Sequence, residues 1–483
     1  MYFSNIYMHH KSRRFVIEKV FNEILNRRVK NNLYRCFYTG NEREMNIYSP
    51  RGSFWNSVGG KKLHIPLPSE IATYSSDLLF GERPKITVEN NKKMENRLNK
   101  IFVDNKIWQK LSMAGEISAV FGSVYLKVII DKNLLLSPIV SVVSPDNAYP
   151  IFNKGVLTSI CFLKEHDLQE GIARVFETYS KGKIETFVYL GDESSLGSKC
   201  ILNDFEFTRD IDEVFLLEEN LFLATFIPNI LPNLDGNFFE GRSDFSGVIG
   251  LFDALDEAYS SWIRDISLGK ARLIVPFEYL GGSSNDLFSE LGIDVGFNKR
   301  PKVFNFNKED ELYVAMDIDT EGKQVQPVMT QFDIRSTEHR ETCLELLQRI
   351  ISKCGYSPQS FGLNISGYSE SGVALNIRER KSFLTKSKKE NLWGEALVPF
   401  FEMLLAIDNI YFQGSLNREN DVKVNIEFSD SITYNATEVA EVIGTLKGSN
   451  GISTRTMVEK VHPSWSDAQV EKEVEDIKNE EVV

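Results

Sequence analysis

Two pairs of aspartates have the spacing of a metal-binding carboxylate site. Asp210 and Asp212 form one D-x-D pair, and Asp317 and Asp319 form the other. Carboxylate oxygens bind Mg²⁺, and a metal-dependent nuclease uses such groups to hold the ion that activates phosphodiester hydrolysis. The chain has 68 acidic residues against 55 basic ones. Because D-x-D pairs arise often by chance in so acidic a chain, we expect neither pair to be catalytic.

Other catalytic signatures are missing from the sequence. Gly367 and Gly372 have the glycine spacing of a phosphate-binding loop, but Val373 and Ala374 follow where a lysine and a hydroxyl are needed. G-x-S-x-G and H-E-x-x-H do not occur, and the six histidines are scattered. We therefore predict a non-enzymatic protein with no cofactor and no bound metal, which cannot itself drive an energetically uphill process.

Composition limits the class of protein further. With 483 residues, 42% of them hydrophobic, the chain is long enough for several substructures. A net charge of −13 does not suit a protein that grips DNA, and a mildly acidic charge is also ordinary for a soluble cytoplasmic protein. The five cysteines show no C-x-x-C spacing and are interpreted as buried thiols in a reducing compartment. No run of about 18 apolar residues occurs, which disfavours a membrane span.

The N-terminal half changes from helical to strand periodicity. Helices are predicted over residues 12–30, 68–80 and 92–120, the last as two segments. Alternating and β-branched runs then predict an antiparallel sheet across roughly 123–225. Residues 226–240 contain two prolines and a glycine and are interpreted as a linker.

Two long amphipathic helices follow, over residues 244–268 and 336–354. The first would be a rod of about 37 Å at the α-helical rise per residue, and Gly269 would end it. Short strands are predicted between the two helices, in residues 270–333. Each helix has a narrow apolar seam, so each needs neighbouring helices to cover it.

A glycine-spaced polar loop separates the second rod from another long helix. The helix would begin near Ser371, run past Trp393 and kink at Pro399. A strand is predicted over 421–430, as a possible addition to the N-terminal sheet, and two or three short helices are predicted after about residue 435. The start of the long helix is basic, which is consistent with a solvated face, proximity to DNA or salt bridges between subunits.

Three stretches resemble the portal proteins of tailed bacteriophages and prophages. The first is CGYSPQSFGLNISGYSE followed by SGVALNIRERKSFLTKSKKENLW, a small-residue turn leading into a long basic helix. The second, IPLPSEIATYSSDLLFGERPKI over residues 65–86, is similar to the family's N-terminal helix and its Phe-Gly-Glu-x-Pro turn. The third, SDFSGVIGLFDALDEAYSSWIRDISLGKARLIVP over 243–276, looks like a first stem helix that runs into a clip.

The resemblance implies an α+β fold with a wing, a long-helix stem, a small α/β clip and a helical crown. The chain would divide into an N-terminal wing (1–240), a first stem helix (241–269), the clip (270–333), a second stem helix (334–355), a tunnel loop (356–370), a kinked helix with a returning wing strand (371–434) and the crown (435–483).

The family also implies partners and a location. Copies of this chain would cover one another's helix seams in a closed ring, expected to be a dodecamer. The ring would form a channel at one capsid vertex of a virion after assembly in the host cytoplasm, and double-stranded DNA would enter and leave through it. Terminase, the packaging ATPase, would dock on the clip, and head-completion or tail adaptor proteins would follow; major capsid and scaffolding proteins complete the expected partners. The alternatives are a metal-dependent nuclease built on Asp317 and Asp319, and an oligomeric scaffold without a channel.

Candidate site residues follow from this resemblance. The DNA-proximal tunnel-loop residues would be Ser357, Gln359, Ser360, Phe361, Asn364, Ser366, Tyr368 and Ser369. The channel or basic-patch residues would be Lys270, Arg272, Arg335, Arg340, Arg349, Arg378, Arg380, Lys381, Lys386, Lys388 and Lys389. Stem packing would use Leu251, Leu255, Trp262, Leu344, Leu347 and Ile351, and the clip would contact its partners through Glu290, Asp294, Lys299 and Arg300.

Overall fold

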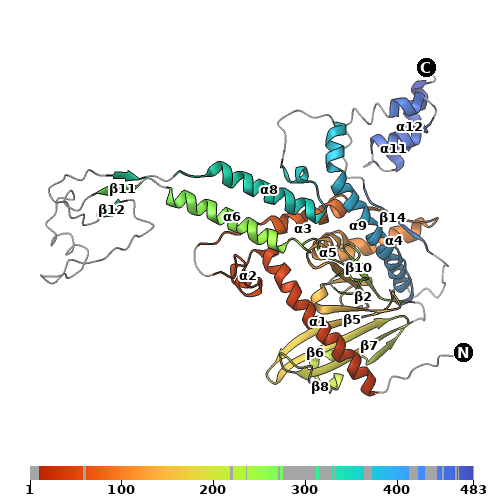
Figure 1. Cartoon of the computed structure of the whole chain (residues 1–483). Helices are drawn as coiled ribbons and strands as arrows, with labels where there is room; N and C mark the ends of the chain where they lie inside the picture. Colours follow the sequence, from red (N-terminus) through yellow and green to blue (C-terminus); the bar gives the residue numbers. More distant parts are fainter. Residues whose placement is uncertain are drawn as a thin grey trace, which may run out of the picture. The chain divides into compact units, whose positions relative to one another are not determined.

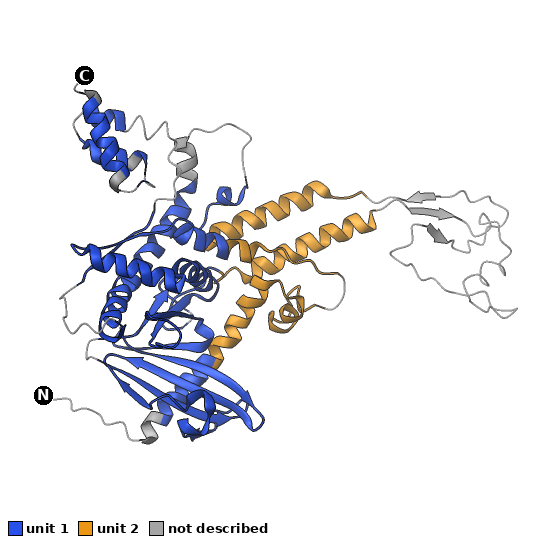
Figure 2. Ribbon diagram, turned by 180° about the vertical axis from the view of Figure 1, so that it is seen from behind, with its two compact units in different colours: residues 1–24, 72–244, 355–483 blue, residues 25–71, 245–354 orange. Residues whose placement is uncertain are grey.

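The chain forms two compact units, each assembled from separate stretches of sequence (Figure 2). Unit 1 comprises residues 1–24, 72–244 and 355–483, and unit 2 comprises residues 25–71 and 245–354. The computed structural model describes residues 10–57, 61–217, 221–234, 236–269, 272–275, 312–314, 328–330, 333–363, 372–412, 422–429, 443–448, 451–462, 465 and 467–481.

Unit 2 is built around two long helices, α6 (Ile249–Leu268) and α8 (Ser336–Cys354), which lie side by side (Figure 1). Asp265 near the end of α6 contacts His339 near the start of α8, so the two helices are antiparallel. α8 has the predicted bounds. α6 begins five residues later than predicted because the chain turns at Gly247, whose φ is +77°. Its 20 residues give a rod of about 30 Å.

The rest of unit 2 includes the second half of a long helix, one short helix and three short strands. The helix α1 (His10–Thr39) continues into it from unit 1 and is followed by α2 (Glu42–Tyr48). Asn41 caps α2 by accepting hydrogen bonds from the backbone N–H groups of Arg43 and Glu44. Three strands, β11 (Arg272–Val275), β12 (Leu312–Val314) and β13 (Val328–Thr330), form one sheet with β11 in the centre. β11 is parallel to β12 and antiparallel to β13.

The strand-rich part of unit 1 contains two sheets where a single sheet was predicted. One has the order β10-β2-β3, and the other has the order β4-β5-β6-β7-β8 with β9 also paired to β7; all pairings are antiparallel. The strand bounds are β2 (Ser123–Ile129), β3 (Ile139–Val143), β4 (Ala148–Asn153), β5 (Val156–Leu168), β6 (Gly171–Ser180), β7 (Lys183–Gly191), β8 (Ser198–Cys200), β9 (Val214–Leu216) and β10 (Ala224–Pro228).

The helices of unit 1 are α3 (Leu67–Phe80), which begins in unit 2, and α4 (Lys92–Asn105), α5 (Ile107–Phe121) and α9 (Gly372–Ile407). Pro399 lies inside α9 without ending it, and a π-helical turn follows over Asp408–Phe412. The strand predicted near residue 425 does not join either large sheet. As β14 (Val424–Glu427) it pairs antiparallel with β1 (Lys85–Val88) in a two-stranded sheet.

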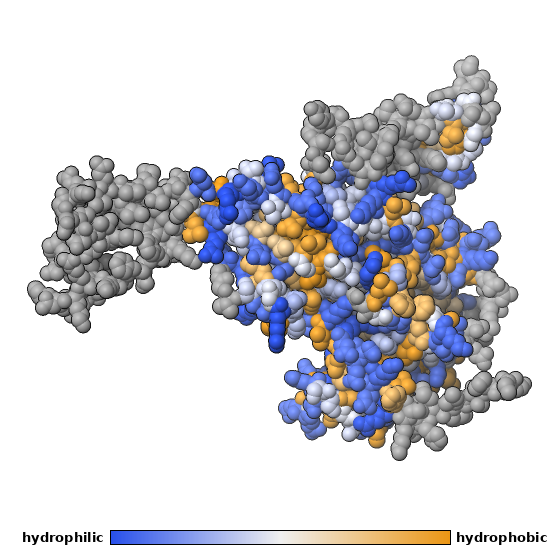
Figure 3. Space-filling model, in the orientation of Figure 1, coloured by the Kyte–Doolittle hydropathy of each residue, from blue (hydrophilic) through white to orange (hydrophobic). Residues whose placement is uncertain are grey.

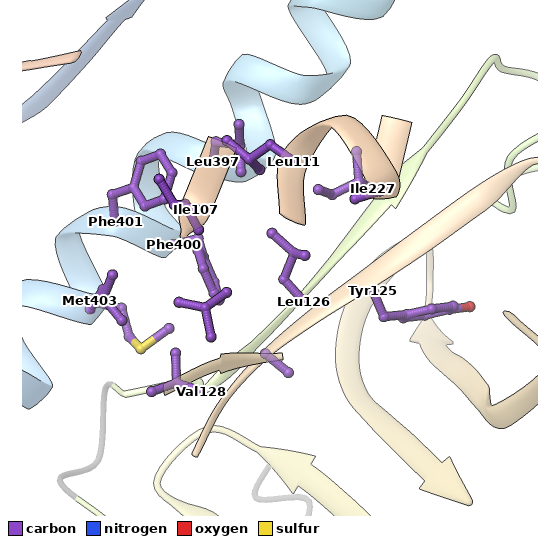
Figure 4. Packing of buried hydrophobic residues seen from close by; sticks show 14 of the residues in the cluster. Ile107, Leu111, Tyr125, Leu126, Val128, Ile227, Leu397, Phe400, Phe401 and Met403 are labelled. Carbon is purple, nitrogen blue, oxygen red and sulfur yellow. The ribbon is translucent and has the colours of Figure 1, made fainter. Parts of the chain in front are cut away.

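The core of unit 1 forms where α5 and α9 pack on the sheet that contains β2 and β10. Figure 4 shows Leu111 of α5, Leu126 of β2, Ile227 of β10 and Phe400 of α9 gathered in one apolar cluster. All four side chains are buried. The cluster therefore joins segments that are nearly 300 residues apart in sequence, and its burial supplies the main driving force for folding this unit.

Two C-terminal helices, α11 (Thr454–Val461) and α12 (Asp467–Glu481), pack on each other. Ser453 caps α11 by accepting a hydrogen bond from Thr456 N–H. Residues 443–448 are also helical. In the part of the chain that the structure describes, no helix has the length and apolar character needed to cross a membrane.

Candidate functional site

A buried polar cluster lies where the chain leaves unit 1 and where it returns. Asp244 is the last residue of unit 1 before α6, and Tyr356 follows α8 by two residues. The Tyr356 hydroxyl donates to Asp244 Oδ2 at 2.7 Å. Lys389 of α9 donates to both Asp244 oxygens, at 3.0 and 2.8 Å, and to Ser75 Oγ of α3 at 2.6 Å. The cluster therefore fastens four separate segments of unit 1 at one point.

Burial makes this cluster energetically important. Asp244 and Lys389 are 4% and 1% exposed. A buried ion pair offsets its desolvation cost only when the remaining hydrogen-bonding groups are satisfied. Here Asn229 Nδ2 also donates to Asp244 Oδ1, at 2.8 Å. Nearby, Gly355 adopts φ +98°, and a Cβ at this position would lie 2.8 Å from Thr385 Oγ1, so a side chain there would be strained.

A second buried carboxylate, Asp256 of α6, holds the segment before α3 within unit 2. It accepts hydrogen bonds from the indole N–H of Trp55 and the backbone N–H of Ile65, both at 2.8 Å. His64 Nδ1 lies 2.8 Å from the same carboxylate. His64 Nε2 is buried and makes no hydrogen bond with any residue that the structure describes. This arrangement covers the first half of one α6 face.

The same face of α6 continues uncovered beyond that point. Phe252, Asp256 and Ser260 are buried, and Ile263 and Ile266 extend this stripe at helical spacing but are 48% and 42% exposed. Figure 3 shows apolar residues along the visible face of the α6–α8 pair. We call Ile263 and Ile266 the distal seam. The expectation that both seams need neighbouring chains is therefore wrong for the buried part of α6 and of α8, and fits only the distal seam.

The predicted stem-packing residues are divided between full and partial burial. Leu255 and Ile351 are buried. Leu251, Trp262, Leu344 and Leu347 are intermediate in exposure. The Trp262 ring stacks on His339, with centroids 6.1 Å apart and planes at 7°.

An ion-pair network lies at the end of this helix pair. Asp265 accepts a hydrogen bond from Arg335 at 2.9 Å, and His339 Nε2 lies 2.9 Å from the same carboxylate oxygen. The hydrogen bond with His339 first, and that with Arg335 second, lower the pKa of Asp265 below its ordinary value of 3.8. The carboxylate therefore stays charged at neutral pH and links the two helices.

The predicted channel arginines on α8 are exposed. This holds for Arg340 and Arg349, and also for Arg335 just before the helix. Arg349 also pairs with Glu345 one turn earlier, at 2.5 Å. Arg272 lies in β11, while Lys270 and the four clip residues Glu290, Asp294, Lys299 and Arg300 lie outside the described residues.

The predicted tunnel loop starts within packed structure. Ser357 is buried and its backbone N–H donates to Ser382 Oγ at 2.9 Å. The short helix Pro358–Phe361 includes Gln359 and Ser360. The Phe361 ring packs against Tyr74, with centroids 4.9 Å apart. The other four loop residues, Asn364, Ser366, Tyr368 and Ser369, lie outside the described residues.

The basic patch on α9 requires a correction. Lys386 and Lys389 are buried, so they do not belong to an exposed basic face. Lys386 donates to the backbone carbonyl of Ser429 at 2.5 Å, and Lys389 belongs to the Asp244 cluster. Sequence alone did not reveal this, because the partners lie 43 and 145 residues away. Arg380, Lys381 and Lys388 are exposed, and Arg378 lies in the helix.

The two D-x-D aspartate pairs give no support for a metal site among the described residues. Asp210 and Asp212 are exposed, and Asp317 and Asp319 lie outside the described residues. Among the described residues, no group of three or more histidine, cysteine, aspartate or glutamate side chains has an arrangement that could hold a metal ion.

The family comparison identifies the kind of protein. The chain belongs to the phage portal protein family, because the family model matches most of its length. The matching description is phage portal protein, SPP1 Gp6-like, over residues 38–482. A comparison with curated protein sequences found no match. The family match favours portal function over the nuclease and scaffold alternatives.

Solved structures with similarity to the chain include parts of gene transfer agent particles. The virion of the native particle gives 10% identity and a TM-score of 0.42, covering 82% of this chain and 89% of that chain. The neck of the empty particle, computed with C6 symmetry, gives 10% identity and a TM-score of 0.43 over 82% and 90% of the two chains. The neck of the native particle, computed with C12 symmetry, gives 10% identity and a TM-score of 0.42, covering 82% of this chain and 89% of that chain.

Proposed function

We propose that the chain assembles into a closed ring of identical copies, with twelve as the expected number, that conducts double-stranded DNA at one vertex of a virion. Family membership over residues 38–482 is the observation that carries this proposal. α6 and α8 would be the stem helices, the strands between them the clip, α11 and α12 the crown, and the sheets of unit 1 the wing. Assembly would take place in the host cytoplasm.

The distal seam supports the ring at the level of residues. Ile263 and Ile266 continue a stripe that is buried in the first half of α6. Covering two half-exposed isoleucines would contribute about 25 cal/mol for each Å² of apolar surface removed from water. A contact in which each copy presents one face to a different face of the next produces a ring when the rotation closes.

The remaining family expectations are part of the same proposal. The part of the predicted tunnel loop that contains Asn364, Ser366, Tyr368 and Ser369 would face the bore, and exposed arginines of α8 would lie near the DNA. The clip would dock first the terminase that powers packaging and later the head-completion or tail adaptor proteins. Major capsid and scaffolding proteins would surround the wing.

The distal seam provides a direct test. The double variant Ile263→Asp, Ile266→Asp places two charges in the proposed interface and should shift the protein from ring to monomer, as measured by light scattering after size-exclusion chromatography. Ile211→Asp with Val214→Asp is the matched control, because both residues are also exposed but lie in unit 1. If the seam variant keeps the mass of a wild-type ring, α6 does not form the contact between copies.

A further inference from the structure

The exposed face of α9 between residues 380 and 391 combines positive charge with an apolar centre. Arg380, Lys381 and Lys388 are exposed, and Leu384 between them is 54% exposed. The helix-forming residues on the opposite face, including Ser382 and Lys389, are buried. We call Arg380, Lys381, Leu384 and Lys388 the basic face.

The apolar centre of the basic face favours a protein partner over DNA. Contacts to the phosphate backbone are made by cationic and polar groups, and a leucine gains little against phosphate oxygens. An exposed leucine among cationic side chains instead suits a partner helix that carries carboxylates, because opposite charges align the helices and the leucine packs on the methylene groups of the acidic side chains.

The outer face of α8 has the complementary pattern. Glu338, Glu341 and Glu345 are exposed and share one face, since they are spaced by three and four residues. We call them the acidic face. The residues that α8 buries, such as Cys343 and Ile350, lie on its other side.

The spacing along the two helices also matches. Glu338 and Glu345 are seven residues apart, as are Lys381 and Lys388, which is about 10 Å along each helix. Leu384 stands three residues after Lys381, as Glu341 stands three after Glu338. Two helices lying side by side can therefore pair both ends of the stripe. Glu345 already pairs with Arg349, so Glu338 and Glu341 are the better residues for tests.

From this complementarity we infer that the basic face of α9 docks on the acidic face of α8 of a second copy of this chain. The contact joins two different faces, so it propagates from copy to copy around a ring. The inference rests on the proposed ring and adds the polar partner surfaces to it. Charge pairing of this kind aligns neighbours and speeds association more than it adds affinity.

Charge reversal tests the pairing. Lys381→Glu with Lys388→Glu, and separately Glu338→Lys with Glu341→Lys, should each slow ring assembly by tenfold or more at low salt. All four reversals in one chain should restore the rate. Glu475→Lys with Asp476→Lys on the exposed acidic side of α12 is the matched control and should assemble like wild type. The inference would be overturned if the α12 reversal, and not the α8 reversal, restored the assembly rate of the basic-face variant.

Zero-length cross-linking of carboxylates to amines gives a second readout that does not depend on the variants. In rings grown from a mixture of ¹⁴N- and ¹⁵N-labelled protein, a Lys381–Glu338 or Lys388–Glu345 cross-link should appear in mixed-isotope form. Cross-links of one isotope only would show a contact within one chain and overturn the inference. Loss of duplex-DNA binding by the lysine variant, with unchanged assembly, would assign the basic face to DNA instead. If wild-type protein forms rings and the reversals have no effect, this inference fails while the proposed function stands.

Discussion

Asp244 in unit 1 and Asp265 in unit 2 are both aspartates bound by a cation and a second donor, yet their surroundings differ. The Asp244 side chain is fully shielded from solvent, and three side chains donate to it. The Asp265 side chain is 26% exposed, and Arg335 beside it is largely in solvent. Removing one partner of a solvent-exposed ion pair lowers the stability of a protein little, whereas removing one partner of a buried pair lowers it strongly. We therefore expect that breaking the Asp244 cluster will destabilise the fold much more than breaking the Asp265 ion pairs.

The largest effect is expected from breaking the buried cluster. Asp244→Ala leaves Lys389 charged and buried without its carboxylate and should lower the free energy of unfolding by about 3 to 5 kcal/mol. Urea titration followed by circular dichroism measures this. Adding Lys389→Met to that variant should recover part of the loss, because the orphaned charge is removed. A single variant as stable as wild type would show that the pair contributes nothing.

A smaller loss is expected at Asp256, where three donors share one carboxylate. Trp55→Phe removes the indole N–H that donates to Asp256 and should cost about 1.5 to 3 kcal/mol, the range for hydrogen bonds to charged groups. The change should be read from the same urea titration. Trp262→Phe is a suitable control, because Trp262 lies only partly buried on the same helix and should lose less.

Replacing Asp265 with asparagine should lower the free energy of unfolding by less than about 1 kcal/mol, because exposed ion pairs are weak and screened by salt. Its pKa is lowered in the folded state. The stabilisation is therefore fully present above the ordinary pKa of 3.8 and disappears as the pH falls through the lowered value. Asp265→Asn should match wild type in stability below this range and fall slightly behind at pH 7. Equal stability of the two proteins at pH 7 would contradict the assignment.

The smallest effect concerns thiol reactivity in the folded protein. Burial raises the pKa of Cys36 and of Cys161 to about 12, so both stay protonated at pH 8 and should resist alkylation. Cys200 is only partly buried and should react first, as mass spectrometry of iodoacetamide-treated protein would reveal. Modification of Cys161 before Cys200 would mean that the sheet opens readily.

Local patterns predicted the stem helices well because the causes of those helices are local. The first helix, in contrast, was predicted over residues 12–30 and extends to Thr39. The bounds of α8 follow from its seam, and the end of α6 follows from Gly269. The start of α6 was missed because Gly247 turns the chain and Asp244 is used in a cluster. The last three residues of β10 were interpreted as linker, since Pro228 and the residues after it hid the pairing of this strand with β2.

Long-range contacts were beyond the reach of the sequence. Lys389 looked like a member of a solvated basic helix, and only Asp244, 145 residues earlier, explains its burial. The roles of Tyr356 and His64 were also missed, because a tyrosine after a helix and an isolated histidine carry no spacing signal. Family membership, by contrast, was predicted from motifs and is confirmed by the match over residues 38–482.

Electron microscopy of the purified wild-type chain tests most directly whether copies of this protein close into a channel. We expect particles with rotational symmetry and a stain-filled central hole at micromolar protein concentration. Compact monomers, open filaments or rings whose centre is filled by protein would contradict this expectation.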